Sequence, residues 1–67
     1  MTFFELTQKY KSLQVGSIIL IDNKNHRVIE NHHDDVVFLA QQYDESKSFH
    51  LFYDEMNPET DDFTLIA

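Results

Sequence analysis

The sequence contains no cysteine, no tryptophan, one glycine and one proline. The lack of cysteine excludes disulfide bonds, thiolate zinc sites and a thiol nucleophile. A single glycine excludes phosphate-binding loops and dinucleotide fingerprints, because both need several glycines for the backbone to approach a phosphate. No serine is tied by its spacing to a histidine and an orienting acid. We therefore predict a protein that is not an enzyme and that uses no cofactor.

Long apolar segments are also lacking. No apolar run approaches the about 20 residues that a membrane-spanning helix needs. The N-terminal residues show no basic region followed by an apolar stretch, the pattern of a secretion signal. Together with the missing cysteines, these absences predict a soluble, cytoplasmic protein.

The chain is short but has enough apolar material to fold. It has 67 residues, of which 42% are hydrophobic and 13% aromatic. This composition argues against disorder, although a domain of this size buries only about 60% of its unfolded surface and has a thin core. We expect a single domain over residues 1–67.

The N-terminal segment has the pattern of an amphipathic helix over residues 2–13. Thr2 and Glu5 have the spacing of a capping box, in which each side chain accepts a hydrogen bond from the backbone of the other residue. Gly16 follows as a turn or stop. Apolar side chains recur three or four residues apart, which predicts one buried helix face: Phe3, Leu6, Tyr10 and Leu13.

Strand-like segments follow Gly16. We expect strands at 17–21, 26–30, 36–43, 48–53 and 63–66, with turns at 22–25 and 44–47 and a loop at 54–62. The short connections predict antiparallel neighbours. Ile18 and Leu20 would face one side of the sheet and Ile19 and Ile21 the other, so both faces need covering. The predicted fold class is α+β: a helix at 2–13 followed by a bent antiparallel meander of about five strands over 17–66, a small open-barrel-like sheet.

The charge is strongly negative and unevenly distributed. The formal net charge is −7, and residues 34–67 hold nine carboxylates and one lysine. Such a surface repels nucleic acid and anionic membranes, so we expect neither as a direct partner. A basic protein surface is the expected partner. The acidic loops supply the candidate partner-binding residues: Asp34, Asp35, Asp54, Glu55, Glu59, Asp61 and Asp62.

We therefore predict a small acidic protein-binding module that docks on a basic surface. Its most concrete form is a nucleic-acid mimic that inhibits a DNA- or RNA-binding protein. The alternative is a structural or assembly subunit that buries an apolar sheet face against a partner or a second copy, forming a homodimer. That face would include Ile19, Ile21 or Phe52.

A metal-binding domain is the third hypothesis. His26, His32 and His33 lie near Asp34 and Asp35, and imidazole and carboxylate groups are ligands for zinc or nickel. Their spacing matches no known metal motif, and adjacent histidines in an extended segment point to opposite sides. We therefore predict no metal site.

Overall fold

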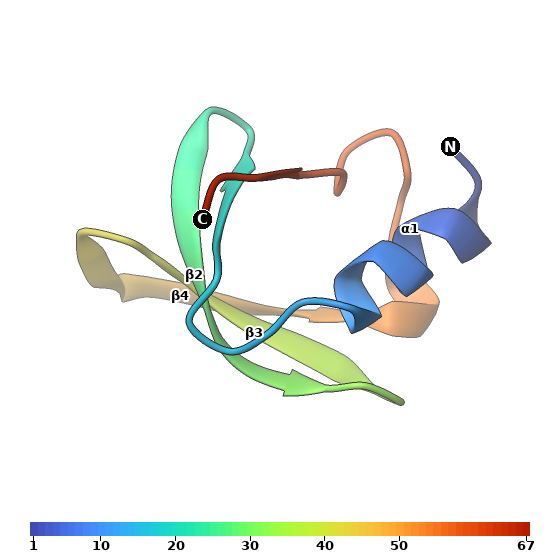
Figure 1. The fold of residues 1–67 in the computed structure, drawn as a ribbon, viewed down its shortest axis with the longest axis horizontal. Coiled ribbons are helices and arrows are strands. Elements are labelled where there is room, and N and C mark those ends of the chain that lie inside the picture. The colour runs from blue at the N-terminus through green and yellow to red at the C-terminus, as the bar shows by residue number, and fades with distance from the viewer.

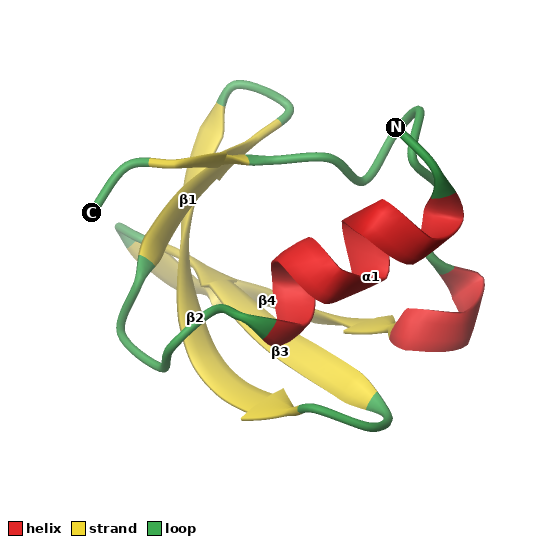
Figure 2. Cartoon of the chain, turned by 45° about the vertical axis from the view of Figure 1, so that its right-hand side comes forward, coloured by secondary structure: helices red, strands yellow, loops and turns green.

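The computed structural model describes residues 1–67, and its elements confirm the α+β class. It has one α-helix, one 3₁₀ helix and five strands: α1 (Phe3–Lys11), β1 (Ile18–Ile21), β2 (Lys24–His32), β3 (Val36–Gln41), β4 (Asp44–Phe52), η1 (Tyr53–Glu55) and β5 (Thr64–Leu65). The strands form one antiparallel sheet in the order β4-β3-β2-β1-β5. The sheet curls around α1 and stays open, with β4 and β5 as its two edges (Figures 1 and 2).

The helix begins with the predicted capping box. The Thr2 hydroxyl accepts a hydrogen bond from the Glu5 backbone nitrogen at 3.1 Å, and the Thr2 nitrogen donates to the Glu5 carboxylate at 3.2 Å. These bonds satisfy two backbone donors that the first helical turn leaves without partners. The helix ends two residues earlier than predicted, at Lys11, where Ser12 forms the C-cap. Gly16 then turns the chain with a φ of 96°, a conformation that suits glycine.

The first hairpin has a tighter turn than predicted. Asp22 and Asn23 have φ values of 51° and 62°, and Ile21 pairs with Lys24 across the turn. Two left-handed residues between paired strands match the type I′ hairpin turn, which follows the natural twist of the strands. Strand β2 therefore starts at Lys24 rather than at residue 26.

The predicted turn at residues 44–47 is wrong. The chain reverses at residues 42–43, and Asp44 already pairs with Gln41 in β4. The next pair joins Ala40 to Ser48, so residues 45–47 bulge out of the ladder. The Asp44 carboxylate accepts hydrogen bonds from the backbone nitrogen and the hydroxyl of Ser46, at 3.2 and 2.5 Å. This local turn chemistry, which the sequence shows clearly, shapes the bulge instead of the hairpin.

The last strand pairs with the first one. Ile19 lies opposite Leu65 and Leu20 opposite Thr64, so β5 adds to β1 and not to the preceding β4. The segment between β4 and β5 crosses the open end of the sheet and passes α1 (Figure 1). This crossing brings residues 57–62 close to the β1–β2 turn.

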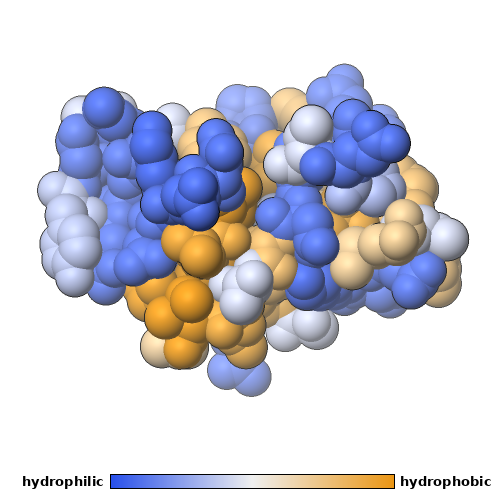
Figure 3. Space-filling model, turned by 90° about the horizontal axis from the view of Figure 1, so that it is seen from above, coloured by the Kyte–Doolittle hydropathy of each residue, from blue (hydrophilic) through white to orange (hydrophobic).

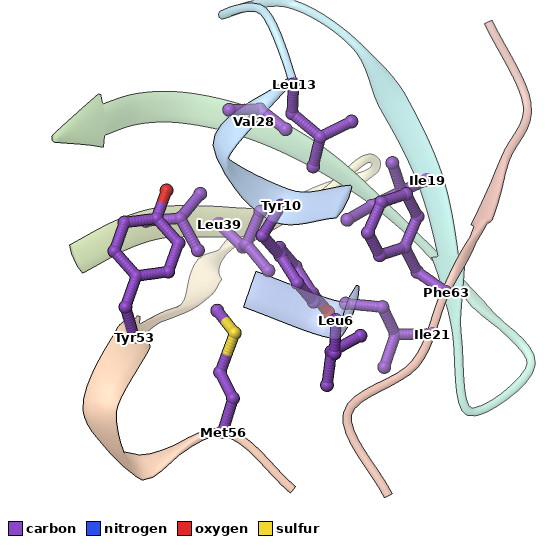
Figure 4. Packing of buried hydrophobic residues seen from close by; sticks show 11 residues of the cluster. Leu6, Tyr10, Leu13, Ile19, Ile21, Val28, Leu39, Tyr53, Met56 and Phe63 are labelled. Carbon is purple, nitrogen blue, oxygen red and sulfur yellow. The ribbon is translucent and has the colours of Figure 1, made fainter. Parts of the chain in front are cut away.

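The core lies between α1 and the concave face of the sheet. Its cluster has 11 buried residues, and Tyr10 is fully buried at its centre (Figure 4). The Tyr10 and Phe63 rings meet edge to face, with their centroids 4.5 Å apart. The predicted helix face is confirmed except at Phe3, which is 46% exposed. Ile19 and Ile21 also lie in this core, so they do not form the exposed apolar sheet face that the alternative hypothesis assigned to them.

Candidate functional site

The predicted partner-binding carboxylates separate into two groups. The first acidic surface consists of Asp34, Asp35, Asp54 and Glu55, in the β2–β3 turn and the adjacent helix η1. The Tyr53 nitrogen donates to the Asp35 carbonyl at 2.9 Å and joins these two segments. The second group lies in the loop before β5 and gains a residue that the sequence did not indicate. We call it the acidic groove: Asp22, Glu59, Asp61 and Asp62.

The acidic groove consists of two adjoining hollows. The outer hollow, of about 430 Å³, is lined by three of the carboxylates together with Thr60. The inner hollow, of about 290 Å³, shares Asp22 and Thr60 with it, so the two hollows lie next to each other. The inner hollow adds the Asp61 carboxylate and the apolar side chains of Ile21, Phe49 and Leu51.

Local hydrogen bonds shape the loop that carries the groove. The Asp61 carboxylate accepts from the Asn57 nitrogen at 2.8 Å, and the Asn57 side-chain oxygen accepts from the Glu59 nitrogen at 2.9 Å. The Asp61 nitrogen donates back to the Asn57 carbonyl at 2.8 Å. Pro58 lies inside this turn, where its fixed φ lowers the number of conformations that the unfolded loop can adopt. These bonds therefore hold the loop backbone and the Asp61 carboxylate in a defined arrangement.

Helix α1 anchors the same loop from below. The Tyr10 hydroxyl donates to the Asp61 carbonyl at 2.5 Å, and the Lys9 ammonium contacts the Asp62 carboxylate at 2.8 Å and the Phe63 carbonyl. The hydrogen bond from Lys9 is the main cause that lowers the pKa of Asp62. Burial, reinforced by the nearby carboxylates of Asp61 and Asp62, raises the pKa of Tyr10 and keeps its hydroxyl protonated as a donor. The core and the groove are thus directly connected.

Most of the negative charge is unpaired. Two of the 12 carboxylate side chains pair with a lysine or arginine, Asp62 with Lys9 and Glu45 with Arg27, and a third, Glu30, contacts the His32 ring. Asp22, Glu59 and Asp61 belong to the nine that have no such partner. Lys24 is the only cation that lines the inner hollow, opposite two carboxylates. The groove therefore keeps an excess of negative charge.

The first acidic surface has a more mixed character. Asp34 and Asp54 line a hollow of about 350 Å³ together with Lys11 and the exposed rings of Phe3 and Phe4. The Lys11 ammonium lies 5.3 Å from the centre of the Tyr53 ring. Lys11 offsets part of the negative charge of this hollow, whereas no cation lines the outer hollow of the acidic groove, so the groove is the stronger candidate for a basic ligand.

The three histidines of the metal hypothesis lie in different places. His26 is buried in the inner hollow, His32 contacts Glu30, and the His33 ring contacts the Lys11 carbonyl at 2.7 Å. No three histidine, aspartate or glutamate side chains converge in the geometry of a metal site.

The convex side of the sheet and β5 carry exposed apolar groups. The rings of His32, Phe38, His50 and Phe52 follow one another across three strands, with centroids 4.8–5.8 Å apart. Leu65 and Ile66 are 58% and 53% exposed. Seen from the side on which β5 lies, hydrophobic surface forms a band between two hydrophilic regions (Figure 3). We call this surface, which includes the exposed Leu65 and Ile66, the apolar band. It is the alternative candidate for an interface.

Neither helix has the length and apolar character that a membrane crossing requires. Searches with family models, among curated proteins and among solved structures find no match to this chain, so the site is defined by its geometry alone.

Proposed function

We propose that this protein is a non-enzymatic binding module that docks a basic protein surface in its acidic groove. The observation that carries the proposal is the gathering of four carboxylates, of which only Asp62 has a cationic partner, around one open groove. Opposed charges steer two surfaces together and fix their register, so a groove with this charge favours a lysine- or arginine-rich partner. A nucleic-acid mimic that inhibits a DNA- or RNA-binding protein is the concrete form, because such proteins present basic grooves.

The arrangement of the groove supports selective docking rather than a general charge effect. Its loop is held by hydrogen bonds to the Asp61 carboxylate, to the Asn57 side chain and from Tyr10, so the loop backbone needs little further ordering when a partner binds. A binding site that is already ordered loses less entropy on association. The apolar floor of the inner hollow also offers a surface for the aliphatic part of a basic side chain.

The test compares two variants that remove equal charge from the two acidic groups. Asp22→Asn/Glu59→Gln changes the groove, and Asp34→Asn/Asp54→Asn changes the first acidic surface. The ligand is a fluorescent hexalysine peptide, whose association and dissociation rates are measured at low and physiological salt. We expect the groove variant to weaken binding about fivefold or more, mainly through slower association, because two exposed charges contribute on the order of 1 kcal/mol. The control variant should have a clearly smaller effect.

Equal losses in the two variants would show that only the net charge matters, and no binding at low salt would refute the proposal. Raised salt should shrink the difference, because exposed charges are screened beyond about 8–10 Å.

Self-association through the apolar band is a second candidate, favoured by the exposed Leu65 and Ile66. An apolar interface would persist at high salt, whereas docking in the groove would not. Sedimentation equilibrium of the free chain at two salt concentrations tests this candidate. A dimer that Ile66→Lys dissociates would support it, and a monomer at high protein concentration would exclude it.

A further inference from the structure

His26 leaves one ring nitrogen without a partner inside the inner hollow. The residue is 4% exposed, and its Nδ1 lies 2.9 Å from the Lys24 carbonyl. A carbonyl only accepts hydrogen bonds, so Nδ1 carries the proton and Nε2 of the neutral ring is an acceptor. Nε2 makes no hydrogen bond within the chain. Every side-chain nitrogen or oxygen that is closed off from solvent has a hydrogen-bond partner, so Nε2 is not among the closed-off atoms. Nε2 therefore remains open to solvent, and the hollow that His26 lines is the space next to this ring.

The surroundings of Nε2 combine acceptors with an aromatic wall. The Phe49 ring meets the His26 ring edge to face at 5.3 Å and is itself 39% exposed. The Asp61 carboxylate accepts one bond at each oxygen, from the Asn57 nitrogen and the Thr60 hydroxyl, and keeps further lone pairs free. Asp22 has no ion-pair partner. The hollow thus presents acceptors from several directions beside an aromatic ring.

We infer that the inner hollow binds the guanidinium group of an arginine side chain from the basic partner. A guanidinium is planar, always charged and has five donors, so it can use more of the acceptors that line the hollow, among them His26, Asp61 and Asp22, than an ammonium can. It also stacks on aromatic rings better than an ammonium does, and Phe49 offers such a ring. The positive charge of Lys24, which also lines the hollow, opposes the binding of a cation. The two negative charges of Asp22 and Asp61 in the same hollow exceed this single positive charge.

This inference rests on the proposed function and makes it more specific. Charge alone would treat arginine and lysine alike, whereas the inner hollow distinguishes them by donor number and shape. A metal ion is a poorer occupant, because no three ligand side chains converge there. The occupant that fits the acceptors, the ring and the charge together is an arginine side chain.

Two capped peptides of equal charge, hexa-arginine and hexalysine, test the inference by calorimetry with the full chain. We expect hexa-arginine to bind about five- to tenfold more tightly, up to about 1.4 kcal/mol. The variant Phe49→Leu should reduce this preference to less than about twofold, because Leu keeps apolar volume and loses the ring, so hexa-arginine should lose more affinity than hexalysine does. Phe52→Leu is the matched control: Phe52 is 38% exposed but lies on the convex face, so the preference should persist.

A measurement without any substitution accompanies this comparison. Titration of the wild-type protein with capped arginine, followed by NMR, should saturably shift the ring signals of His26 and Phe49 and leave those of His50 unchanged. Capped citrulline, which has the same shape without the charge, should not. If both peptides bind equally and the His26 signals stay fixed, the inference is wrong and the proposed function stands. If neither peptide binds, both fail.

Discussion

The hydroxyl of Tyr10 offers a sharp test of how the core supports the acidic groove. Tyr10→Phe removes one oxygen atom from a fully buried side chain and leaves the ring contact with Phe63 in place. The Asp61 carbonyl then loses the donor that lies 2.5 Å away. The substitution leaves no large cavity, so its effect isolates this hydrogen bond.

The expected loss of stability follows from the cost of an unsatisfied acceptor. A hydrogen bond of this kind contributes about 0.5–1.5 kcal/mol, and a partly buried carbonyl left without a partner costs about 1–3 kcal/mol. We expect Tyr10→Phe to lower the free energy of unfolding by about 1–2 kcal/mol. For a domain of this size, each kcal/mol corresponds to about 4–8 °C in Tm.

Urea and thermal denaturation, followed by circular dichroism, measure this loss. Tyr43→Phe is the control, because Tyr43 is 91% exposed at a turn and should have no effect. Amide hydrogen exchange should also become faster at residues 57–63 in Tyr10→Phe, because the loop loses its anchor. A loss below about 0.5 kcal/mol together with unchanged exchange would refute the reasoning.

The same variant has a pH signature. The folded pKa of Tyr10 is raised, mainly by burial, so the folded state holds its proton more tightly than the unfolded state. The resulting stability is present below pH about 10, the tyrosine pKa of the unfolded chain, and is lost as pH rises toward the folded value. The free energy of unfolding should therefore fall less steeply above pH about 10 in Tyr10→Phe than in the wild type.

Three further predictions concern the stability of the fold and are checked by the same denaturation experiments. Thr2→Ala should cost about 0.5–2 kcal/mol because it removes the N-cap, and an unchanged stability would contradict the capping box. Gly16→Ala should cost about 1–2 kcal/mol from backbone strain at a φ of 96°, since an added methyl group meets no atom within 4 Å. Lys9 lowers the pKa of Asp62, so Asp62 stabilises the fold above pH about 4 and loses this effect as pH falls through its folded pKa. Asp62→Asn should therefore cost up to about 1 kcal/mol at pH 7 and progressively less as pH falls through the folded pKa of Asp62, a modest effect because the pair is solvent-screened.

The features that depend on neighbours along the chain could be predicted from the sequence. The capping box of Thr2 and Glu5 and the burial of Tyr10 follow from spacing within one helix, where contacts are set by the 3.6-residue period. The inward and outward alternation of Ile18–Ile21 follows from the two-residue period of a strand in the same way. Local geometry determines each of these features.

The features that depend on distant residues could not be predicted. The sequence gives no sign that β5 pairs with β1, and this pairing alone places the last loop beside Asp22. We predicted a single set of seven partner-binding carboxylates, whereas the chain divides them into two groups and adds Asp22 to one of them. The two-residue period of a strand puts Phe49 and Leu51 on the same face of β4, but the role of Phe49 as a wall beside His26 depends on the curl of the sheet. The signal that could have indicated the groove is the left-handed Asp22–Asn23 turn, which is typical of a tight hairpin that presents its side chains to solvent.

The most direct test of the central claim is to map where a basic ligand contacts the protein. Uniformly ¹⁵N-labelled protein is titrated with hexalysine at low salt, and the shift of each backbone amide is followed to saturation. Docking in the acidic groove predicts the largest shifts at Asp22, Glu59, Asp61 and Asp62, with small shifts at Asp34, Asp35, Asp54 and Glu55. Largest shifts on the first acidic surface, or weak shifts spread evenly over both groups, would contradict the claim.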